Sequence, residues 1–496
     1  MLPKEGTQMK KNQKMRKGLR LGFCALAFAG CCALYAQTPA GMSTFDIPES
    51  AFCRRGLIES RFEQSPAIVK NLDSQVVQNE IGDYFLVRHE EANGELQIIV
   101  APLVRKKTEA EELSTGFSLS AVKDKDGVAV LQRSNSTEKN RSKSASEAWT
   151  KTWPKDAPGS WILYRDASSG APLRIRYYFV PDKEVYVEFF PGKDKCFADF
   201  IIYGAVAAGK VPLPVPFERL YAFSAEELYL LTRYTLPWNY TRIFVRSYGD
   251  VKEMTSLIRS MLPGFRNSER FKSKNASLDF LKWIADGLVK PLTGGIIAEE
   301  SLEMNTVETE GQTADVKLKG LPRRIPDEKY GPLNYIRNIA AAVLSADTGV
   351  QYRYDTSGAD VKTEAFSYYK DSSGVPRSGG FVANSGYPVE ILKPLLYILG
   401  VTEARHFFFG AVRKSRPAEV PAGQLPERQV FAETAAFFPY FDSEGHFQVS
   451  VFENAHEYTL DEFIGKYRGC FVSLVRIKAA KEFYPDRFEE RYPSEL

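Results

Sequence analysis

The residues with the clearest chemical potential open a predicted helix in the second half of the chain. Residues 275–283 read Asn-Ala-Ser-Leu-Asp-Phe-Leu-Lys-Trp, so Ser277 precedes apolar residues at helical spacing. The free N–H groups and the dipole of a helix N-terminus favour the negatively charged form of a nucleophile placed there. Far downstream, the strand predicted over residues 430–438 carries Glu433. Ser277 and Glu433 are therefore the candidate catalytic residues.

Two other interpretations compete with a nucleophilic Ser277. A serine without a neighbouring base is a poor nucleophile, and the sequence places no histidine beside it. Serine is also a preferred N-cap residue, because its side chain accepts a hydrogen bond from the helix backbone, so we expect capping to be its role. A hydrolase that uses carboxylates such as Asp279 and Glu433 is the remaining enzymatic hypothesis.

This region resembles the papain-like cell-wall peptidases of bacteria, whose motif Asp-Cys-Ser-Gly-Phe begins a helix and faces a histidine at the start of a strand. When the Lys-Trp endings are aligned, the five motif positions fall in order on Ala276, Ser277, Leu278, Asp279 and Phe280. Only Phe280 matches the motif, and Glu433 with Thr434 stands in the approximate place of the histidine. The resemblance implies a degenerate, non-hydrolytic papain-like domain that still holds peptide or glycan in the former cleft.

No other motif predicts a cofactor or metal site. Residues 204–210 have the spacing of a phosphate-binding loop, but Val211 replaces the hydroxyl that Mg²⁺ requires and Pro212 prevents the helix that would hold the phosphate. We expect only a glycine-bounded turn there. The four histidines are His89, His406, His446 and His456. None has metal-ligand spacing, and CxxC, HExxH and Gly-x-Ser-x-Gly are absent, so we predict no cofactor and no metal.

The start of the chain has the pattern of a secretory signal. Residues 1–36 contain seven basic side chains and one acid, and an apolar run follows the basic stretch over residues 21–34. A run of 14 residues is short of the ~20 that a permanent membrane helix needs. We therefore expect an exported protein, located in the periplasm or outer envelope of a bacterium.

Two processing routes fit this signal. Leu34-Tyr35-Ala36 before Gln37 suits ordinary cleavage after Ala36. Phe28-Ala29-Gly30-Cys31 resembles the lipobox of bacterial lipoproteins, in which Cys31 would carry the lipid. The membrane is therefore expected as a partner only through an N-terminal lipid.

Charge and cysteine content exclude two further classes. Without its first 36 residues the chain has 58 basic and 61 acidic side chains, so it lacks the basic excess that binds phosphate backbones, and nucleic acid is not an expected partner. Cys53, Cys196 and Cys470 are then the only cysteines, which is no disulfide framework. Cys196 and Cys470 lie in apolar runs, where buried, unreactive thiols are expected.

The pattern of apolar residues predicts an α+β protein of several domains. We assign a signal peptide to residues 1–36, a poorly defined leader to 37–82, an antiparallel β-rich domain to 83–216 and a domain with helices followed by strands to 217–496. Between Asp83 and Tyr203, seven short apolar runs predict strands.

Two segments carry particular weight in the β-rich half. Leu173-Arg174-Ile175-Arg176-Tyr177 alternates, which places the two arginines on one face of a strand and the apolar side chains on the other. The alternating prolines of residues 211–216 predict an extended spacer, where we place the domain boundary. Consecutive aromatic residues divide between two faces, so core packing is expected and carbohydrate binding is the alternative.

Helix signals dominate the first part of the second half. Ser224 with Glu227 and Thr459 with Glu462 form capping boxes, and Asp250 is expected to cap a third helix. The helix that begins near Ser277 is expected to close at Pro291. Helices are also predicted over 335–344 and 389–399, and strands over 407–412, 430–438, 447–452 and 471–477. Residues 293–333 and 354–380 lack clear periodicity and predict long irregular insertions.

Together these features favour an exported bacterial envelope protein that binds or scaffolds without catalysis. Peptidoglycan, peptide and glycan are the expected partners. The alternatives are a peptidoglycan peptidase or amidase that uses Ser277, and a structural lipoprotein anchored through Cys31.

Overall fold

A computed structural model of the chain describes residues 45–107, 119–123, 129–133, 149–268, 270–273, 275–307, 330–371, 373–414 and 430–487. The chain divides into a short unit, Met1–Asp46, and a unit, Ile47–Leu496, that holds every element named below. The predicted signal peptide and the lipidation candidate Cys31 lie outside the described residues.

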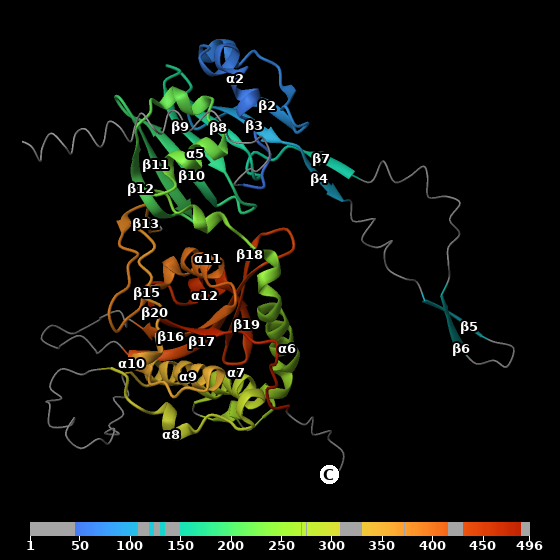
Figure 1. Ribbon diagram of the computed structural model, residues 1–496, viewed down its shortest axis with the longest axis vertical. Coiled ribbons are helices and arrows are strands. Elements are labelled where there is room, and N and C mark those ends of the chain that lie inside the picture. Colours follow the sequence, from blue (N-terminus) through green and yellow to red (C-terminus); the bar gives the residue numbers. More distant parts are fainter. Residues whose placement is uncertain are drawn as a thin grey trace, which may run out of the picture. The chain divides into compact units, whose positions relative to one another are not determined.

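The first half is an antiparallel β-rich region and the second half is mixed, as the sequence predicts for an α+β chain (Figure 1). A ten-stranded antiparallel sheet is built, in spatial order, from β1 (Gln75–Gln78), β2 (Tyr84–Ala92), β3 (Glu95–Pro102), β8 (Trp161–Asp166), β9 (Pro172–Tyr178), β10 (Val185–Pro191), β11 (Cys196–Ile202), β12 (Ala205–Leu213), β13 (Tyr368–Lys370) and β14 (Pro376–Arg377). Two further pairs join β4 (Val104–Lys107) to β7 (Trp149–Thr152) and β5 (Leu119–Lys123) to β6 (Ala129–Arg133).

The alternation in β9 sets the two faces of this sheet, as predicted. Ile175 and Tyr177 are fully buried, and Ile175 lies opposite Leu163 of β8. Arg174 and Arg176 are half-buried on the opposite face. Because side chains alternate with a period of two, a register shift of one residue would exchange the apolar and basic faces.

The segment predicted as a poorly defined leader has regular structure from residue 51 onward. It forms α2 (Ala51–Arg55), the π-helix η2 (Ile58–Phe62), α3 (Pro66–Val69) and edge strand β1. The ring of Phe62 packs 5.1 Å from Trp161 and 5.5 Å from Tyr221. The prediction was wrong because these elements are too short for a periodic signal and depend on contacts with distant strands.

The predicted spacer is also corrected. Residues 211–213 belong to β12, where Pro212 lies opposite Phe197 of β11. Alternating prolines fix an extended φ, and that conformation is compatible with a strand as well as with a linker.

The predicted irregular insertion over residues 354–380 is also structured in part. It contains α10 (Tyr354–Ser357) and the strands β13 and β14, which extend the sheet of the first half.

The second half is built around a six-stranded antiparallel sheet with helices on both faces (Figure 1). Its strands are, in spatial order, β15 (Tyr387–Pro388), β20 (Phe471–Lys478), β16 (His406–Lys414), β17 (Val430–Phe441), β18 (Phe447–Glu453) and β19 (His456–Thr459). Its helices are α6 (Gly249–Arg266), α7 (Ala276–Thr293), α8 (Glu299–Leu302), α9 (Gly331–Thr348), α11 (Leu392–Thr402) and α12 (Leu460–Lys466). Helix α5 (Ala225–Thr232) lies instead with the ten-stranded sheet, and its first backbone N–H donates to Glu49 (Figure 1). Short helical turns are η4 (Phe217–Tyr221), η5 (Trp238–Thr241), η6 (Val245–Tyr248), η7 (Arg270–Lys272) and η10 (Val389–Ile391).

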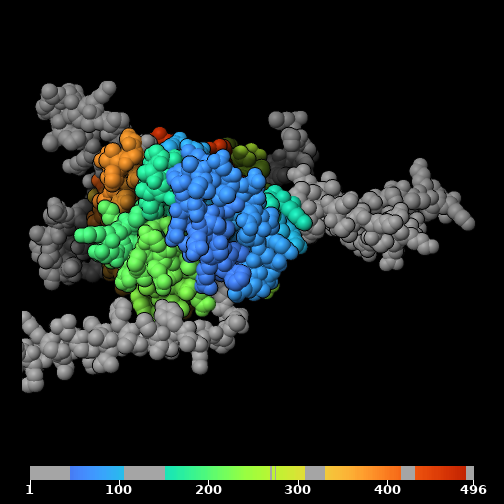
Figure 2. All heavy atoms as spheres, turned by 90° about the horizontal axis from the view of Figure 1, so that it is seen from above, coloured from blue at the N-terminus to red at the C-terminus, as the bar shows by residue number. Residues whose placement is uncertain are grey.

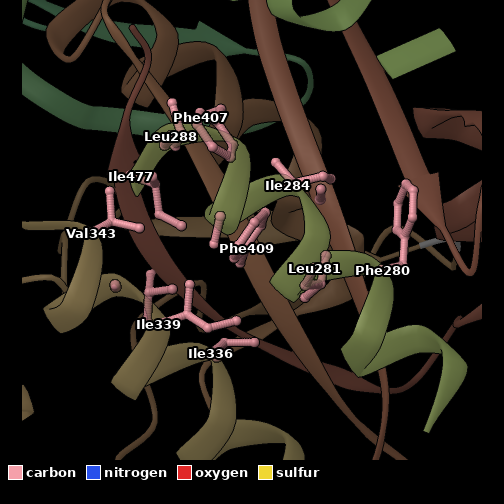
Figure 3. Packing of buried hydrophobic residues seen from close by; sticks show 14 of the residues in the cluster. Phe280, Leu281, Ile284, Leu288, Ile336, Ile339, Val343, Phe407, Phe409 and Ile477 are labelled. Carbon is pink, nitrogen blue, oxygen red and sulfur yellow. The ribbon is translucent and has the colours of Figure 1, made fainter. Parts of the chain in front are cut away.

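Apolar side chains from α6, α7 and α9 form one core with the sheet face that carries Phe407 and Phe409 (Figure 3). The opposite face packs on α11 and α12, where Phe437 meets Phe463 of α12 at 5.1 Å and Phe441 meets Tyr397 of α11 at 5.4 Å. The sheet is therefore covered on both sides, which holds α7 and α9 in fixed positions.

Local helix signals differ in how well they place helix ends. Both predicted capping boxes are confirmed, since Ser224 accepts from the Glu227 backbone and Thr459 from the Glu462 backbone. Asp250 is not an N-cap, because α6 begins at Gly249 and Asp250 lies inside the first turn. Pro291 does not end α7, which continues to Thr293 before a glycine with φ of 73°.

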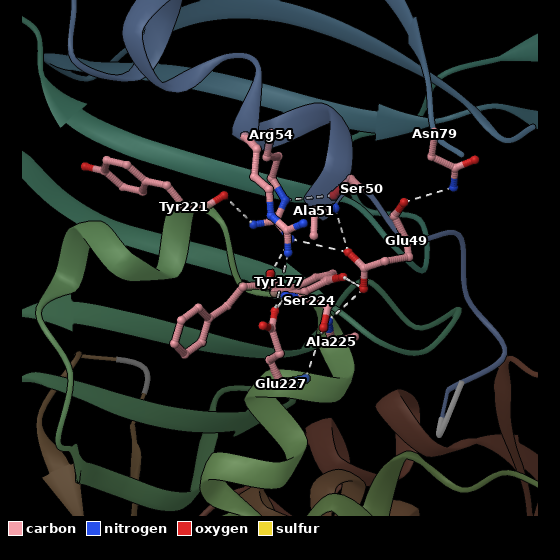
Figure 4. Close-up of polar contacts among 12 residues, drawn as sticks. Glu49, Ser50, Ala51, Arg54, Asn79, Tyr177, Tyr221, Ser224, Ala225 and Glu227 are labelled. Atoms are coloured by element: carbon pink, nitrogen blue, oxygen red, sulfur yellow. Dashed lines mark hydrogen bonds and ion pairs between the residues drawn. The ribbon is translucent and has the colours of Figure 1, made fainter. Parts of the chain in front are cut away.

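A buried arginine ties the first elements to the sheet and to η4 (Figure 4). Arg54 is fully buried and donates to Ser50 Oγ, Glu49 Oε1 and three backbone carbonyls. Those carbonyls belong to Leu220, Tyr221 and Phe223, at 3.2, 2.8 and 2.6 Å. The guanidinium also lies 5.0 Å from the Trp161 ring. These contacts provide acceptors for its five N–H groups, as a charge removed from water requires.

We expect Arg54→Ala to lower the free energy of unfolding by about 3–5 kcal/mol, because it leaves three carbonyls and Glu49 without their buried donor. Urea unfolding followed by far-UV circular dichroism measures the change. Arg55→Ala is the matched control: its side chain is 54% exposed, and we expect a change within about 0.5 kcal/mol. Equal effects of the two variants would contradict a central role for Arg54.

Candidate functional site

The first turn of α7 places Ser277 inside the helix, not at its cap. The carbonyl of Asn275 accepts hydrogen bonds from the backbone of Leu278 and Asp279, at 2.8 and 2.9 Å. Asn275 is therefore the N-cap residue, and Ser277 is the second residue of the helix. The prediction that Ser277 caps the helix was wrong, because Asn275 offers a competing start two residues earlier. Ser277 is half-buried, and no hydrogen bond of its hydroxyl is found within the described residues.

The start of β17, where Glu433 and Thr434 stand in the place of the histidine of the papain-like motif, provides no base that hydrogen-bonds to Ser277 within the described residues. Helix α7 packs on β17, but Glu433 Oε1 accepts from Lys414 Nζ at 2.8 Å in the neighbouring strand. Thr434 is 1% exposed, and its hydroxyl has no hydrogen-bond partner among the described atoms. In the same part of the chain, no hydrogen bond joins Ser277 to Glu433 or Thr434, so the structure does not link the predicted pair.

The four histidines have other surroundings. His456 Nδ1 lies 2.8 Å from the Asn454 carbonyl, and its ring is 6.2 Å from that of Phe271 in η7, just before α7. His446 lies at a hairpin turn beside Asp442, as predicted for a surface histidine. Burial lowers the pKa of His406, whose Nδ1 has no partner among the described atoms. No hydrogen bond from an imidazole to Ser277 is found in the described ranges, and His89 lies on β2.

Carboxylates near α7 serve structure. Asp279 accepts from the Ser273 hydroxyl just before the helix. Asp286 is bound by Lys282 at 2.7 Å and by the backbone of Ile297 at 2.9 Å, in a pair whose side chains are almost fully buried. Both oxygens of Asp286 and one oxygen of Asp279 therefore accept hydrogen bonds from the protein.

A second polar cluster lies on the arginine face of the β-rich sheet. Arg174 makes a bidentate pair with Glu95 at 2.7 and 2.8 Å, and Arg176 donates to Glu188 at 3.0 and 2.8 Å. The guanidinium of Arg174 lies 3.9 Å from the Tyr164 ring centre, and that of Arg176 lies 4.0 Å from Tyr186. The arginine side chains keep 21% and 23% of their surface exposed. Planar rings and fixed hydrogen-bonding groups thus share one partly open surface.

Arg174, Arg176, Glu95, Glu188, Tyr164 and Tyr186 form the surface called the Arg–Tyr face below. Its electrostatic environment holds Glu95 and Tyr164 each in one ionisation state. The hydrogen bond from Arg174 lowers the pKa of Glu95, and burial raises the pKa of Tyr164 to about 12. Glu95 therefore stays charged and Tyr164 stays neutral near pH 7. The alternation in β9 correctly predicted that the two arginines share one face of the strand. Glu95 of β3 and Glu188 of β10 were not predicted as their partners, because strand pairing brings them together. The only sequence signal for them was a single acidic residue within each strand.

The segment with phosphate-loop spacing and the three cysteines Cys53, Cys196 and Cys470 also lie within the described residues. Residues 203–204 form the turn that leaves β11, and residues 205–210 already belong to β12, so the phosphate-loop spacing occupies a turn and strand. Cys53 and Cys196 are buried, Cys470 is half-buried, and none of the three is in a disulfide. Burial raises the pKa of Cys196 to about 11, as expected for an unreactive thiol.

The described residues also bear on metal binding and on membrane spanning. Within the ranges that the structure covers, no three His, Cys, Asp or Glu side chains gather closely enough to hold a metal ion. Among the same residues, no helix combines the length and apolar character that crossing a bilayer requires.

Comparison with known proteins gives one match. Residues 43–240 match a family described as a domain of unknown function, DUF8515, which covers less than half of the chain. The matched range includes α2, η2, α3 and β1, and it continues through η4 and α5. No curated protein and no solved structure matches the chain.

The buried hydroxyl of Thr434 gives a test of the site. Because this hydroxyl has no partner among the described atoms, Thr434→Val removes an unpaired polar group, and we expect a gain of about 1 kcal/mol in unfolding free energy. Thr255→Val is the control: Thr255 is equally buried but donates to the Val251 carbonyl at 2.7 Å, so we expect a loss of about 1 kcal/mol. Chemical denaturation measures both. A loss in both variants would mean that the Thr434 hydroxyl is bonded.

Proposed function

We propose that this chain is an exported bacterial envelope protein that binds a cell-wall polymer, through its glycan or its peptide, without cleaving it. Its second half is proposed to be a degenerate papain-like domain. The observation that carries the proposal is the environment of Ser277: the hydroxyl stands in the first turn of a helix, and no imidazole hydrogen-bonds to it within the described residues. Without a base, a serine hydroxyl with a pKa far above 7 does not attack an amide at a useful rate.

The Arg–Tyr face supports the binding part of the proposal. Tyr186 and the two arginines offer flat surfaces, and the guanidinium and carboxylate groups are already oriented by one another. Such preorganised planar groups bind sugars and peptide groups at a low cost in side-chain entropy. Arg174, Arg176, Glu95 and Glu188 together carry no net charge, which suits a ligand that is itself close to neutral.

The absence of catalysis is tested on purified peptidoglycan. We expect the chain from Gln37 onward to release no more soluble fragments from sacculi than a blank, because no base hydrogen-bonds to Ser277 within the described residues. Ser277→Ala is expected to bind sacculi as well as the unaltered protein. Release of fragments that Ser277→Ala abolishes would reverse the proposal and identify a peptidase or amidase.

Binding to the Arg–Tyr face is tested by cosedimentation with the same sacculi. We expect Tyr186→Ala to weaken binding about three- to tenfold, because one stacking ring contributes about 0.5–1.5 kcal/mol. Tyr234→Ala is the matched control, since Tyr234 is 87% exposed and lies outside this face. Equal loss in both variants, or none in either, would remove the face from the proposed function.

A further inference from the structure

One end of the ten-stranded sheet is an edge of unusual composition. Strand β1 pairs with β2 on one side only, and its four residues are Gln-Val-Val-Gln. A terminal strand presents a row of backbone N–H and C=O groups that no neighbouring strand satisfies. Natural proteins protect such edges with charges, prolines, bulges or covering elements, because an unprotected edge pairs with another chain.

The other edges of the two large sheets carry these protections. Strand β14 contains Pro376 and Arg377, and β15 ends in Pro388. Strand β19 carries Glu457, which Arg259 binds at 2.6 Å. Only β1, among these four edges in the described residues, has neither a proline nor a charge. The contrast indicates that β1 is kept open for pairing.

Exposed apolar side chains surround the same edge. Phe52 is 50% exposed, Val76 54%, Ile81 81% and Tyr84 41%. Between α2 and β1 lies a groove of about 560 Å³ that Phe52, Leu57 and Val77 line. Figure 2 looks onto the blue residues of this segment, which form an outer surface of the molecule in that view (Figure 2). Clustered apolar exposure beside an open edge is typical of an interaction surface.

We propose that β1 is a self-association edge, on which a second copy of this chain adds its own β1 in antiparallel orientation. A twofold axis perpendicular to the sheet joins two such edges and keeps each sheet face continuous. A twofold interface must be complementary to itself, and the groove meets this condition, because it carries one cation, Arg55, and one anion, Glu80. The paired edge satisfies the free backbone groups of both copies and brings the apolar side chains of Val76 and Phe52 next to the second copy.

The oligomeric state of the chain from Gln37 onward tests this assignment. We expect analytical ultracentrifugation to show a concentration-dependent dimer in the micromolar range. Val76→Lys, which places a charge on the edge, and Phe52→Glu, which places one in the groove, are each expected to weaken the dimer at least about tenfold. Val375→Lys is the matched control, because Val375 is 45% exposed beside β14 at the opposite edge.

A second measurement separates strand pairing from mere surface contact. Hydrogen exchange of the β1 amides is expected to slow as the concentration rises, and Val76→Lys is expected to remove that slowing while leaving the melting temperature unchanged. A monomer at every concentration up to about 200 µM, or a dimer that tolerates both substitutions, would overturn the proposal. A monomer that instead binds an added extended peptide at β1 would also overturn it, since the occupant would not be a second copy. None of these outcomes depends on whether the chain binds or cleaves peptidoglycan.

Discussion

The buried guanidinium of Arg54 is the constraint on which the first half of the structure depends. A charge with no exposed surface is tolerated only when its donors all have acceptors, and here the acceptors come from residues 49–50 and 220–223. Glu49 extends the cluster to the backbone of Ala225 at 2.7 Å. The first elements, the sheet and the start of α5 are therefore one cooperative unit. The family match over residues 43–240 includes every one of these groups.

Local patterns predicted the elements whose stability is local. Alternation in β9 gave the correct faces, and the capping boxes at Ser224 and Thr459 gave correct helix starts, because each depends on residues no more than four apart. The long apolar strands β16, β17 and β20 were also found from their composition. The α+β class follows from these elements alone, since periodicity reports which face of an element is buried.

Elements held by distant contacts were not predicted, for a physical reason. Arg54 has the same local appearance as its exposed neighbour Arg55, and only acceptors more than 160 residues away distinguish them. The prolines of β12 were assigned to a spacer because an extended φ is common to both states. At the candidate site, sequence could place Ser277 near a helix start. The choice between Ser277 and Asn275 as cap depends on backbone geometry that spacing does not determine.

Many charged side chains of this protein are paired with one another, and this pairing limits long-range electrostatic attraction to a partner. The polar groups of the Arg–Tyr face pair with one another, as do Lys414 with Glu433 and Lys282 with Asp286. Paired charges project little field beyond the Debye length, so long-range attraction cannot bring a partner to this surface. In the two proposals, affinity comes instead from contact: stacking on Tyr186 at one surface, and apolar contact around Phe52 with backbone hydrogen bonds at β1 at the other.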